Sequence, residues 1–402
     1  MQVTGLKVSQ FRNIRQMELH PCPGVNVIYG ENGQGKSNLL EAIWLFTGAG
    51  SFRQSKIHEM IRIGETASVL ELEFADAQRE QTGWMKLSGR KEVQFNRIPC
   101  RSQSEIAGHF YGVVFSPSDL DLIQGGPKYR RQFCDDAISQ LRPQYAEYLE
   151  GYRKVLEQRN SLLKEILRQP SLQDTLFLWD EQLARLGTII SLYRKDYLHK
   201  LGRFCQPLYQ GLSGGKESFF LGYLSSAFEN LDQLTSYTPE TVALYQKKLA
   251  DGLETDLRQG STSVGIHRDD LDIQVNGLSV RVYGSQGQQR SSVLAMKFGE
   301  ASMIRRITGE QPVLLLDDVM SELDPSRQAY ILNHIKDTQV FLTCCDPAGP
   351  LRMKEGKSFQ IQNGALILEK QRGQESGREE KEDVSVFGPG HGGGQPDGDG
   401  DL

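Results

Sequence analysis

The chain has 402 residues, of which 38% are hydrophobic and 24% charged, a balance typical of a soluble globular protein with a large core. No run approaches the ~18 consecutive apolar residues that a membrane-spanning helix needs, so we expect no membrane partner. The formal net charge is −5, and its distribution along the chain matters more than its total.

The negative charge is concentrated at the C-terminal end. Residues 371–402 contain eight acids and three bases, so this segment has a formal net charge of −5 and residues 1–370 have a net charge of zero. The segment is also rich in glycine, so it can bury too little apolar surface to offset its ordering entropy. We therefore expect a disordered acidic tail, and the net charge does not argue against nucleic-acid binding by the rest of the chain.

The N-terminus and the cysteines indicate the compartment. The opening sequence MQVTGLKVSQFRNIRQ carries charge throughout and lacks the apolar run of a secretory signal. The six cysteines show no CxxC spacing, which disfavours a disulfide framework or a zinc site. We expect a cytoplasmic protein with reduced thiols.

Strands dominate the first 110 residues. VTGLKVSQF, VNVIYG, ASVLELEFAD, WMKLSG and EVQFN each alternate or form short apolar runs bounded by turn residues. One helix, at about Ser37–Leu45, interrupts them directly after a glycine-rich loop. This pattern predicts a sheet-rich lobe with one central helix.

From about Gly126 to Phe204 apolar residues recur at helical spacing. One stripe runs from Leu141 to Ile166 and a second from Leu172 to Leu201, with the turn sequence RQPSLQD between them. Two such helices would pair antiparallel as a hairpin arm. The alternative is a pair of core helices in a compact domain. After Gly211 the pattern returns to mixed α/β.

A phosphate-binding loop is predicted at Gly30-Glu31-Asn32-Gly33-Gln34-Gly35-Lys36-Ser37, which fits G-x-x-x-x-G-K-[ST]. The loop follows the strand VNVIY and precedes the apolar helix NLLEAIWLF, the context that the motif requires. Its glycines let backbone N–H groups surround phosphates, and the helix N-terminus adds a favourable dipole. Lys36 would reach the outer phosphates, and the Ser37 hydroxyl would bind Mg²⁺.

An acidic strand supports the same function. Leu314-Leu315-Leu316-Asp317-Asp318 is an apolar run that ends in two acids, and VFLTCCD at 340–346 is predicted to be the next parallel strand. Carboxylates at the C-terminal end of such a strand lie where ligands bind in open α/β sheets. Asp317 is suited to hold Mg²⁺, and Asp318 to orient or activate the attacking water.

A third element, Tyr283-Gly284-Ser285-Gln286-Gly287-Gln288-Gln289-Arg290, opens the helix SSVLAMKFGEAS. Serine and glycine at a helix N-terminus form another anion site, although the same residues also make a simple capping turn. One chain needs only one triphosphate site. A second one here suggests that it covers the γ-phosphate held by another copy of the chain.

These elements, in this order, resemble the ABC-type ATPase heads, and more narrowly the RecF family. The resemblance extends over about residues 1–370, and it is carried also by Phe11-Arg12-Asn13, FSPSDL (115–120), RRQF (130–133), GIHRDD (265–270) and LLLDDVMSELD (314–324). It implies an α/β ATPase head with a second helical lobe that forms a short antiparallel arm. It also implies a homodimer that closes on ATP and Mg²⁺ and binds single-stranded, gapped and junction DNA.

The resemblance assigns partners and residue roles as well. It implies that the protein helps to load RecA with RecO and RecR, as a slow, DNA-stimulated ATPase in which ATP acts mainly as a dimerisation switch. Ser285, Gln286 and Gly287 would be the signature that acts in trans, and Ser321 and Asp324 would lie in a loop across the dimer interface. Arg268 would lie close to the nucleotide or the interface. Asp318 stands where most ABC-type ATPases carry Glu, and its shorter reach fits slow hydrolysis.

DNA would be held through its phosphates, without base readout. Candidate contacts are Arg53, Lys56, Lys128, Arg130 and Arg131, each of which could equally be a solvated surface charge. The predicted organisation is an N-terminal ATPase part (1–125), a helical arm (126–210), a part with signature and acidic strand (211–370) and the tail (371–402).

Two other classes of protein are considered. A chromosome-organising SMC-type ATPase would carry a coiled coil of hundreds of residues, and a transporter subunit would carry a signature closer to LSGGQ. LSGG does occur at 212–215, but no helix followed by an acidic strand lies at the needed distance after it, so we interpret it as a loop. ATP-dependent binding of gapped DNA without membrane would distinguish the RecF-type function from both.

Overall fold

The computed structural model describes residues 1–101, 103–335, 337–345 and 356–372. Met1–Arg372 form one unit. Apart from its first two residues, which end a strand, the predicted acidic tail lies outside the described residues, as does Asp346. Among the helices that are described, none is both long and apolar enough to cross a bilayer.

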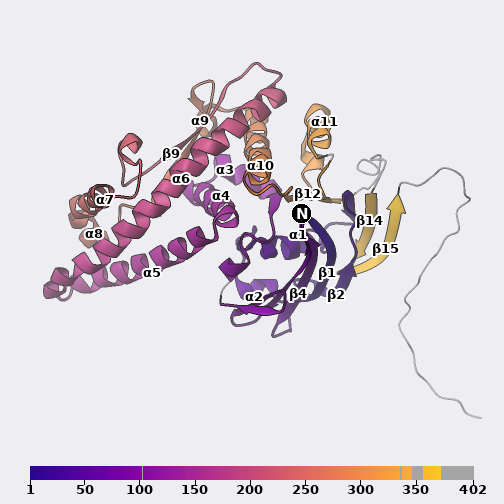
Figure 1. Cartoon of the computed structure of the whole chain (residues 1–402), viewed down its shortest axis with the longest axis horizontal. Coiled ribbons are helices and arrows are strands. Elements are labelled where there is room, and N and C mark those ends of the chain that lie inside the picture. The colour runs from indigo at the N-terminus through magenta and orange to yellow at the C-terminus, as the bar shows by residue number, and fades with distance from the viewer. Residues whose placement is uncertain (102, 336, 346–355, 373–402) are drawn as a thin grey trace, which may run out of the picture. The chain divides into compact units, whose positions relative to one another are not determined.

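A six-stranded sheet gathers strands from distant parts of the sequence (Figure 1). Its order is β15 (Ala365–Arg372), β14 (Gly356–Gln362), β3 (Val25–Tyr29), β13 (Val340–Cys344), β12 (Val313–Asp317) and β8 (Gly112–Phe115). All neighbours pair in parallel except β14 and β15. The strands β12, β13 and β8 are buried along their whole length, which is why they are continuous apolar runs in the sequence.

A second, antiparallel sheet is formed by the N-terminal strands. Its order is β2 (Ile14–Leu19), β1 (Gln2–Phe11), β4 (Ser68–Ala75), β5 (Glu80–Leu87), β6 (Lys91–Phe95) and β7 (Ile98–Cys100). Helix α1 (Lys36–Trp44) and the 3₁₀ turn η1 (Leu45–Thr47) share one apolar core with both sheets. The predicted strands and the predicted helix are therefore confirmed, whereas β2, β7 and β8 are additional.

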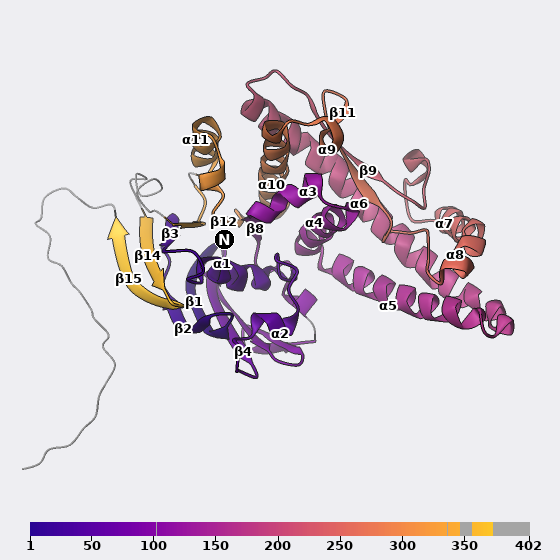
Figure 2. The ribbon, with the colours of Figure 1, turned by 180° about the vertical axis from the view of Figure 1, so that it is seen from behind.

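The predicted pair of long helices is present. Helix α5 (Pro143–Ile166) packs along α6 (Leu176–Ser213), and the turn η4 (Pro170–Thr175) joins them at one end (Figures 1 and 2). Helix α6 also packs against α10 (Gln286–Thr308), α7 (Pro239–Asp251) and β9 (Phe219–Leu224). The second helix is thus part of the arm and part of the core. It ends at Ser213, just past the boundary predicted at 210/211, and both sides of that boundary belong to the unit Met1–Arg372.

The remaining elements are a small sheet and a set of short or peripheral helices. Strands β9, β10 (Asp270–Val275) and β11 (Leu278–Ser279) form a small antiparallel sheet. The other elements are α2 (Ile57–Met60), η2 (Gln103–Ile106), η3 (Pro117–Leu120), α3 (Asp121–Gln124), α4 (Pro127–Leu141), η5 (Leu231–Gln233), α8 (Leu253–Gln259), α9 (Val280–Tyr283), η6 (Met320–Glu322) and α11 (Pro325–His334).

The packing of α6 against α7 depends on a glycine in α6. A Cβ atom on Gly187 would clash with the buried ring of Tyr245 from α7, whereas a Cβ atom on Gly151 in α5 would lie 3.5 Å from Leu186. Gly187→Ala should therefore destabilise the protein by about 1–3 kcal/mol. Gly151→Ala should be neutral or stabilise by up to ~1 kcal/mol, because alanine favours the helix. Urea unfolding of both variants tests this, and equal effects of the two changes would contradict the packing.

Candidate functional site

The loop between β3 and α1 has the backbone shape of a phosphate-binding loop. Gly30, Gly33 and Gly35 have φ angles of 151°, 78° and 109°, which side-chain-bearing residues rarely adopt. A Cβ atom on Gly30 would clash with the carbonyl oxygen of Ile361, and one on Gly35 would lie 2.6 Å from Asn13 Oδ1. The glycines are thus required by conformation and by close approach. Glu31 and Asn32 between them are exposed.

Lys36 lies across this loop. Its Nζ donates to the carbonyl oxygens of Gly30 (2.7 Å) and Glu31 (2.8 Å) and lies 3.8 Å from Cys345 Sγ. Among the described residues, no side chain caps the N-terminus of α1, which starts at Lys36 and continues with Ser37. Its first backbone N–H groups and the ammonium together make a site for a highly charged anion. This geometry suits the predicted roles of residues 30–37.

The two acids at the end of β12 are fixed by the neighbouring strand. Thr343 Oγ1 in β13 donates to Asp317 Oδ1 (2.9 Å) and accepts from the backbone N–H of Asp318 (2.9 Å). Asp317 is only 7% exposed. Asp318 has φ 52°, and the Ser321 hydroxyl contacts its Oδ1 (3.0 Å) and carbonyl oxygen (2.8 Å). Because β12, β13 and β3 are parallel, these acids and the phosphate loop follow strand ends at the same sheet edge.

Thr343 was not singled out from the sequence. The signal that could have identified it is a lone polar residue inside the fully buried strand Val340–Cys344. A buried hydroxyl needs a hydrogen-bond partner, and the acidic strand end was the nearest predicted polar group. Thr343 therefore belongs to the site as the residue that orients Asp317.

The predicted signature forms the start of α10. Ser285 caps this helix: its Oγ accepts from the backbone N–H of Gln288 (3.2 Å), and Gln288 Oε1 accepts from the N–H of Ser285 (2.8 Å). Ser285 and Gln286 are exposed, and Gly287 is half-buried. The structure thus places these residues at the surface, where another molecule could reach them, and it also shows the capping role that the sequence left open.

A second residue that the sequence reasoning missed, Arg327, joins the signature to the predicted interface loop. Arg327 Nη2 donates to the carbonyl oxygen of Gly287 (3.1 Å), Nε donates to Ser291 Oγ (3.0 Å), and Nη1 pairs with Asp324. Asp324 also caps α11, accepting from the N–H groups of Ser326 and Arg327 (both 3.1 Å). Hydrogen bonds from Ser326 and Arg327 hold the pKa of Asp324 well below its usual range.

The GIHRDD segment lies in the helical lobe. Buried Asp269 pairs with Arg194 and accepts from the Ser226 N–H (2.8 Å), while exposed Arg268 donates to the Thr262 carbonyl oxygen (3.0 Å). These contacts tie α6 to the loops before β10. They give Arg268 a structural role, and its predicted closeness to a nucleotide stays a prediction.

The five predicted DNA contacts differ in accessibility. Arg130 is 3% exposed and makes a bidentate pair with Asp270 (2.5 and 2.9 Å), so its guanidinium is not available to a DNA phosphate. The prediction for Arg130 is corrected on this ground. Arg131 is half-buried and donates to the Asp269 carbonyl oxygen (2.8 Å).

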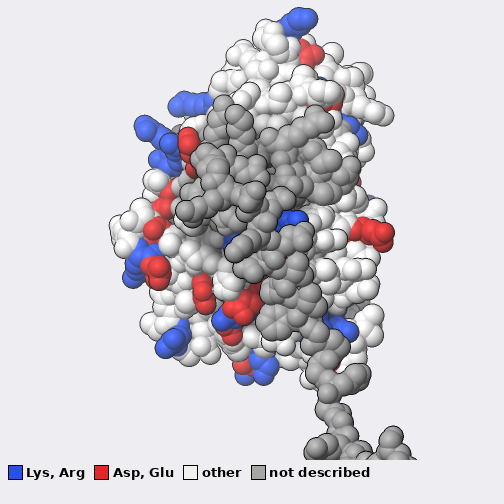
Figure 3. Space-filling model, turned by 90° about the vertical axis from the view of Figure 1, so that its right-hand side faces the viewer, with Lys and Arg blue, Asp and Glu red and all other residues white. Residues whose placement is uncertain are grey.

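The other three candidates are exposed, and one of them contacts the helix that follows the phosphate loop. Arg53 donates to Asn38 Oδ1 (2.8 Å) in α1, and Lys128 donates to Gln54 Oε1 (2.7 Å). Lys56 is the N-cap residue of the short helix α2, and its backbone N–H donates to Glu59 Oε2 (2.7 Å). On the described part of the face in Figure 3, Lys and Arg are interspersed with Asp and Glu, so that face shows no basic stripe.

Comparisons with known proteins agree with this geometry. The model of the "RecF/RecN/SMC N terminal domain" family matches residues 2–355. The "DNA replication and repair protein RecF" of Agathobacter rectalis is 38% identical over 370 residues, covering 91% of this chain and 99% of that protein. Its counterpart in Caldanaerobacter subterraneus is 40% identical over 346 residues, covering 85% and 94%. A solved structure of "the recombination mediator protein RecF-ATP in RecFOR pathway" superposes with a TM-score of 0.83 at 38% identity, covering 91% and 96%.

The conformation of Gly35 provides a test of the loop. Gly35→Ala introduces both an unfavourable φ and the clash with Asn13, at a cost of about 1–3 kcal/mol. We expect the affinity for a fluorescent nucleoside triphosphate to fall roughly five- to hundredfold. Gly50→Ala is the matched control, since a Cβ atom there meets no described atom within 4 Å. Unchanged affinity of the Gly35 variant would contradict a phosphate-binding role.

His267 makes the stability of the helical lobe depend on pH. Its Nε2 contacts the Thr262 carbonyl oxygen (2.9 Å) and its Nδ1 the Tyr152 hydroxyl (3.0 Å), and burial lowers its pKa to about 4. His267 therefore takes up a proton less readily in the folded than in the unfolded protein. Its contribution to the free energy of unfolding is complete above pH ~6.5 and is lost as the pH falls towards 4. His267→Gln should flatten this part of the profile of thermal midpoints, whereas the exposed His199→Gln should not. Identical profiles for the wild type and His267→Gln would refute this.

Proposed function

The chain belongs to the RecF family of DNA replication and repair proteins, and we propose that it is an ATP-controlled DNA-binding protein of recombinational repair and replication restart. The observation that carries the proposal is the placement of the Lys36 loop and the Thr343-fixed acids at one sheet edge. This is the arrangement that binds a nucleoside triphosphate together with a metal ion.

ATP and Mg²⁺ fit the residues present. Lys36 and the uncapped N-terminus of α1 provide positive charge and N–H donors for phosphates. The Ser37 hydroxyl and the Asp317 carboxylate are the oxygen ligands that Mg²⁺ prefers. When bound, Mg²⁺ would neutralise charge on the outer phosphates. The solved relative described as RecF-ATP supports the choice of nucleotide.

Asp318 is the proposed group that orients or activates the attacking water. Its backbone is held by Thr343, and its carboxylate contacts Ser321, so its position is fixed. Its side chain is one methylene shorter than the Glu of most related ATPases. We infer slow hydrolysis, stimulated by DNA, in which the ATP-bound state matters more than the rate of turnover.

The exposed signature supports an ATP-dependent homodimer. Ser285, Gln286 and Gly287 of one copy would cover the γ-phosphate held by the phosphate loop of the other. Asp324 would lie at the interface, and its bond to Arg327 would keep it aligned with the signature of its own copy. A dimer that binds ATP better than ADP would close on ATP and open after hydrolysis.

DNA would bind across the dimer through phosphate contacts. Lys56, Lys128, Arg53 and Arg131 remain the candidates, and affinity should fall as salt rises. The preferred DNA would be single-stranded, gapped or at a junction with duplex. The RecFOR pathway named for the solved relative supports RecR and RecO as partners. We further propose RecA loading as the outcome, a place in the SOS response to DNA damage, and a cytoplasmic location.

The two other protein classes find less support. The arm consists of α5 and part of α6, and α6 packs into the lobe rather than continuing as a coiled coil. LSGG at 212–215 ends α6, with Gly214 as its C-cap, and does not open a helix as a transporter signature would.

Two variants test the proposed function. Lys36→Ala should lower ATP affinity by about tenfold or more, because a charged donor to the phosphates is lost. Ser285→Arg should bind ATP normally yet stay monomeric and retain less gapped DNA. Ser171→Arg on the exposed turn η4 adds the same charge away from the signature and should behave as wild type. Light scattering and filter binding with and without ATP provide the readouts.

The outcomes separate the steps of the proposal. Dimerisation of both variants on ATP would refute the shared nucleotide site. Normal DNA retention by an ATP-saturated monomer would refute ATP control of DNA binding.

A further inference from the structure

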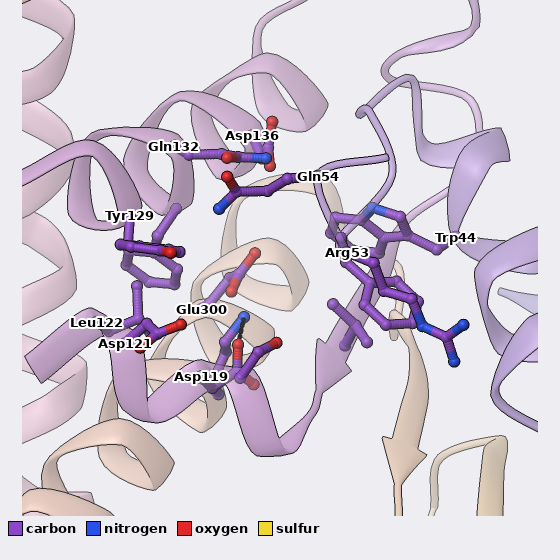
Figure 4. A pocket seen from close by; sticks show the side chains of 15 residues that line it. Trp44, Arg53, Gln54, Asp119, Asp121, Leu122, Tyr129, Gln132, Asp136 and Glu300 are labelled. Atoms are coloured by element: carbon purple, nitrogen blue, oxygen red, sulfur yellow. Dashed lines mark ion pairs between the residues drawn. The ribbon is translucent and has the colours of Figure 1, made fainter. Parts of the chain in front are cut away.

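A cavity of ≈ 330 Å³ lies beside the phosphate-loop helix, and its lining contains none of residues 30–37, Asp317 or Asp318. Its walls come from the end of α1 and the following loop, from η3 and α3, from α4, and from the middle of α10 (Figure 4). Its size is in the range of small-molecule sites.

The lining of this cavity is acidic. Four acids and two bases line it, namely Asp119, Asp121, Asp136, Glu300, Lys297 and Arg53. Lys297 Nζ pairs with Asp119 at 3.3 Å, and Arg53 donates to Asn38. The lining therefore carries more acidic than basic side chains.

Glu300 is the feature that points to a ligand. It is 3% exposed, and its Oε2 has no hydrogen-bond partner among the described residues. Figure 4 shows its carboxylate pointing into the space bordered by Gln54, Tyr129 and Asp119. A buried, unpaired carboxylate oxygen is costly, and a hydrogen-bond donor entering the cavity would remove that cost.

Aromatic rings define the kind of donor that fits. Trp44, Phe52, Tyr129 and Phe133 also line the cavity. The ammonium of Lys297 already lies 5.3 Å from the ring centre of Phe133. The guanidinium of Arg53 lies 5.7 Å from the ring centre of Phe52. Rings with carboxylates between them attract organic cations, through the ring faces and through charge-assisted hydrogen bonds.

We propose that this cavity binds a small aliphatic amine cation, a diamine or polyamine, with Glu300 and Asp136 as the carboxylates that receive its ammonium groups. The site adjoins the proposed nucleotide site, because Arg53 in its lining donates to Asn38, the residue after Ser37. Because Glu300 lies in α10, which begins with the signature, the amine would contact the helix that carries Ser285.

Binding would be coupled to proton release. Burial raises the pKa of Glu300 to about 8 and that of Asp136 to about 7, so an ammonium placed beside them displaces protons. The titratable groups that act on Glu300 come from several elements: Asp119 (η3), Cys134 and Asp136 (α4), Tyr197 and Cys205 (α6) and Lys297 (α10).

Calorimetric titration of the full chain with putrescine, without nucleotide or DNA, tests the proposal. At pH 7.5 in 150 mM salt the wild type should bind one putrescine per chain, with heats that differ between two buffers of unlike ionisation enthalpy. The neutral analogue 1,4-butanediol should not bind. Glu300→Gln and Asp136→Asn should each weaken binding by about tenfold or more, since a charge-assisted hydrogen bond is lost.

A control and a second variant keep the test decisive. Glu181→Gln removes a partly exposed acid of α6 that pairs with Arg185 and should bind as wild type. If Glu300→Gln fails to fold in a thermal melt, Asp121→Asn at the same cavity takes its place. Absence of binding by the wild type would overturn the proposal. So would equal binding by the wild type and the cavity variants, which would place the amine elsewhere on the chain.

Discussion

The parallel pairing of β3, β13 and β12 is the constraint on which the rest of the site depends. These strands begin at residues 25, 340 and 313, and only their pairing brings the phosphate loop and the acids of β12 to one edge. The middle strand contributes directly, because Thr343 holds both Asp317 and the backbone of Asp318. Burial of apolar side chains thus stabilises the order of these strands. The Thr343 hydroxyl orients Asp317 and holds the backbone of Asp318.

Local patterns in the sequence predicted much of this correctly. The glycine-rich loop, its flanking strand and helix, the buried acidic strand and the α5–α6 pair are each encoded within a short window, and the structure contains them all. Contacts between distant residues could not be predicted. In the sequence Arg130 resembles a surface charge, because its partner Asp270 lies 140 positions away. Arg327 belongs to no sequence motif that predicts its hydrogen bond to Gly287. The boundary predicted at 210/211 falls in the last turn of α6, which ends at Ser213.

Arg327 connects two segments by hydrogen bonds that the sequence motifs do not predict. It connects the first turn of α10 with Asp324 at the start of α11, so the signature and the interface loop are held in one arrangement. A partner copy that contacts either element would therefore meet both in a fixed relation.

The position of the Lys36 ammonium has a consequence for selectivity. In the structure it is already solvated by two carbonyl oxygens of its own loop, at 2.7 and 2.8 Å. An incoming anion must offer more than these dipoles before the lysine exchanges partners. Weakly charged anions such as chloride or a monophosphate compete poorly for it, whereas a polyanion of closely spaced oxygens competes well. If the loop binds the proposed nucleotide, the two hydrogen bonds of Lys36 therefore favour a polyphosphate over a singly charged anion.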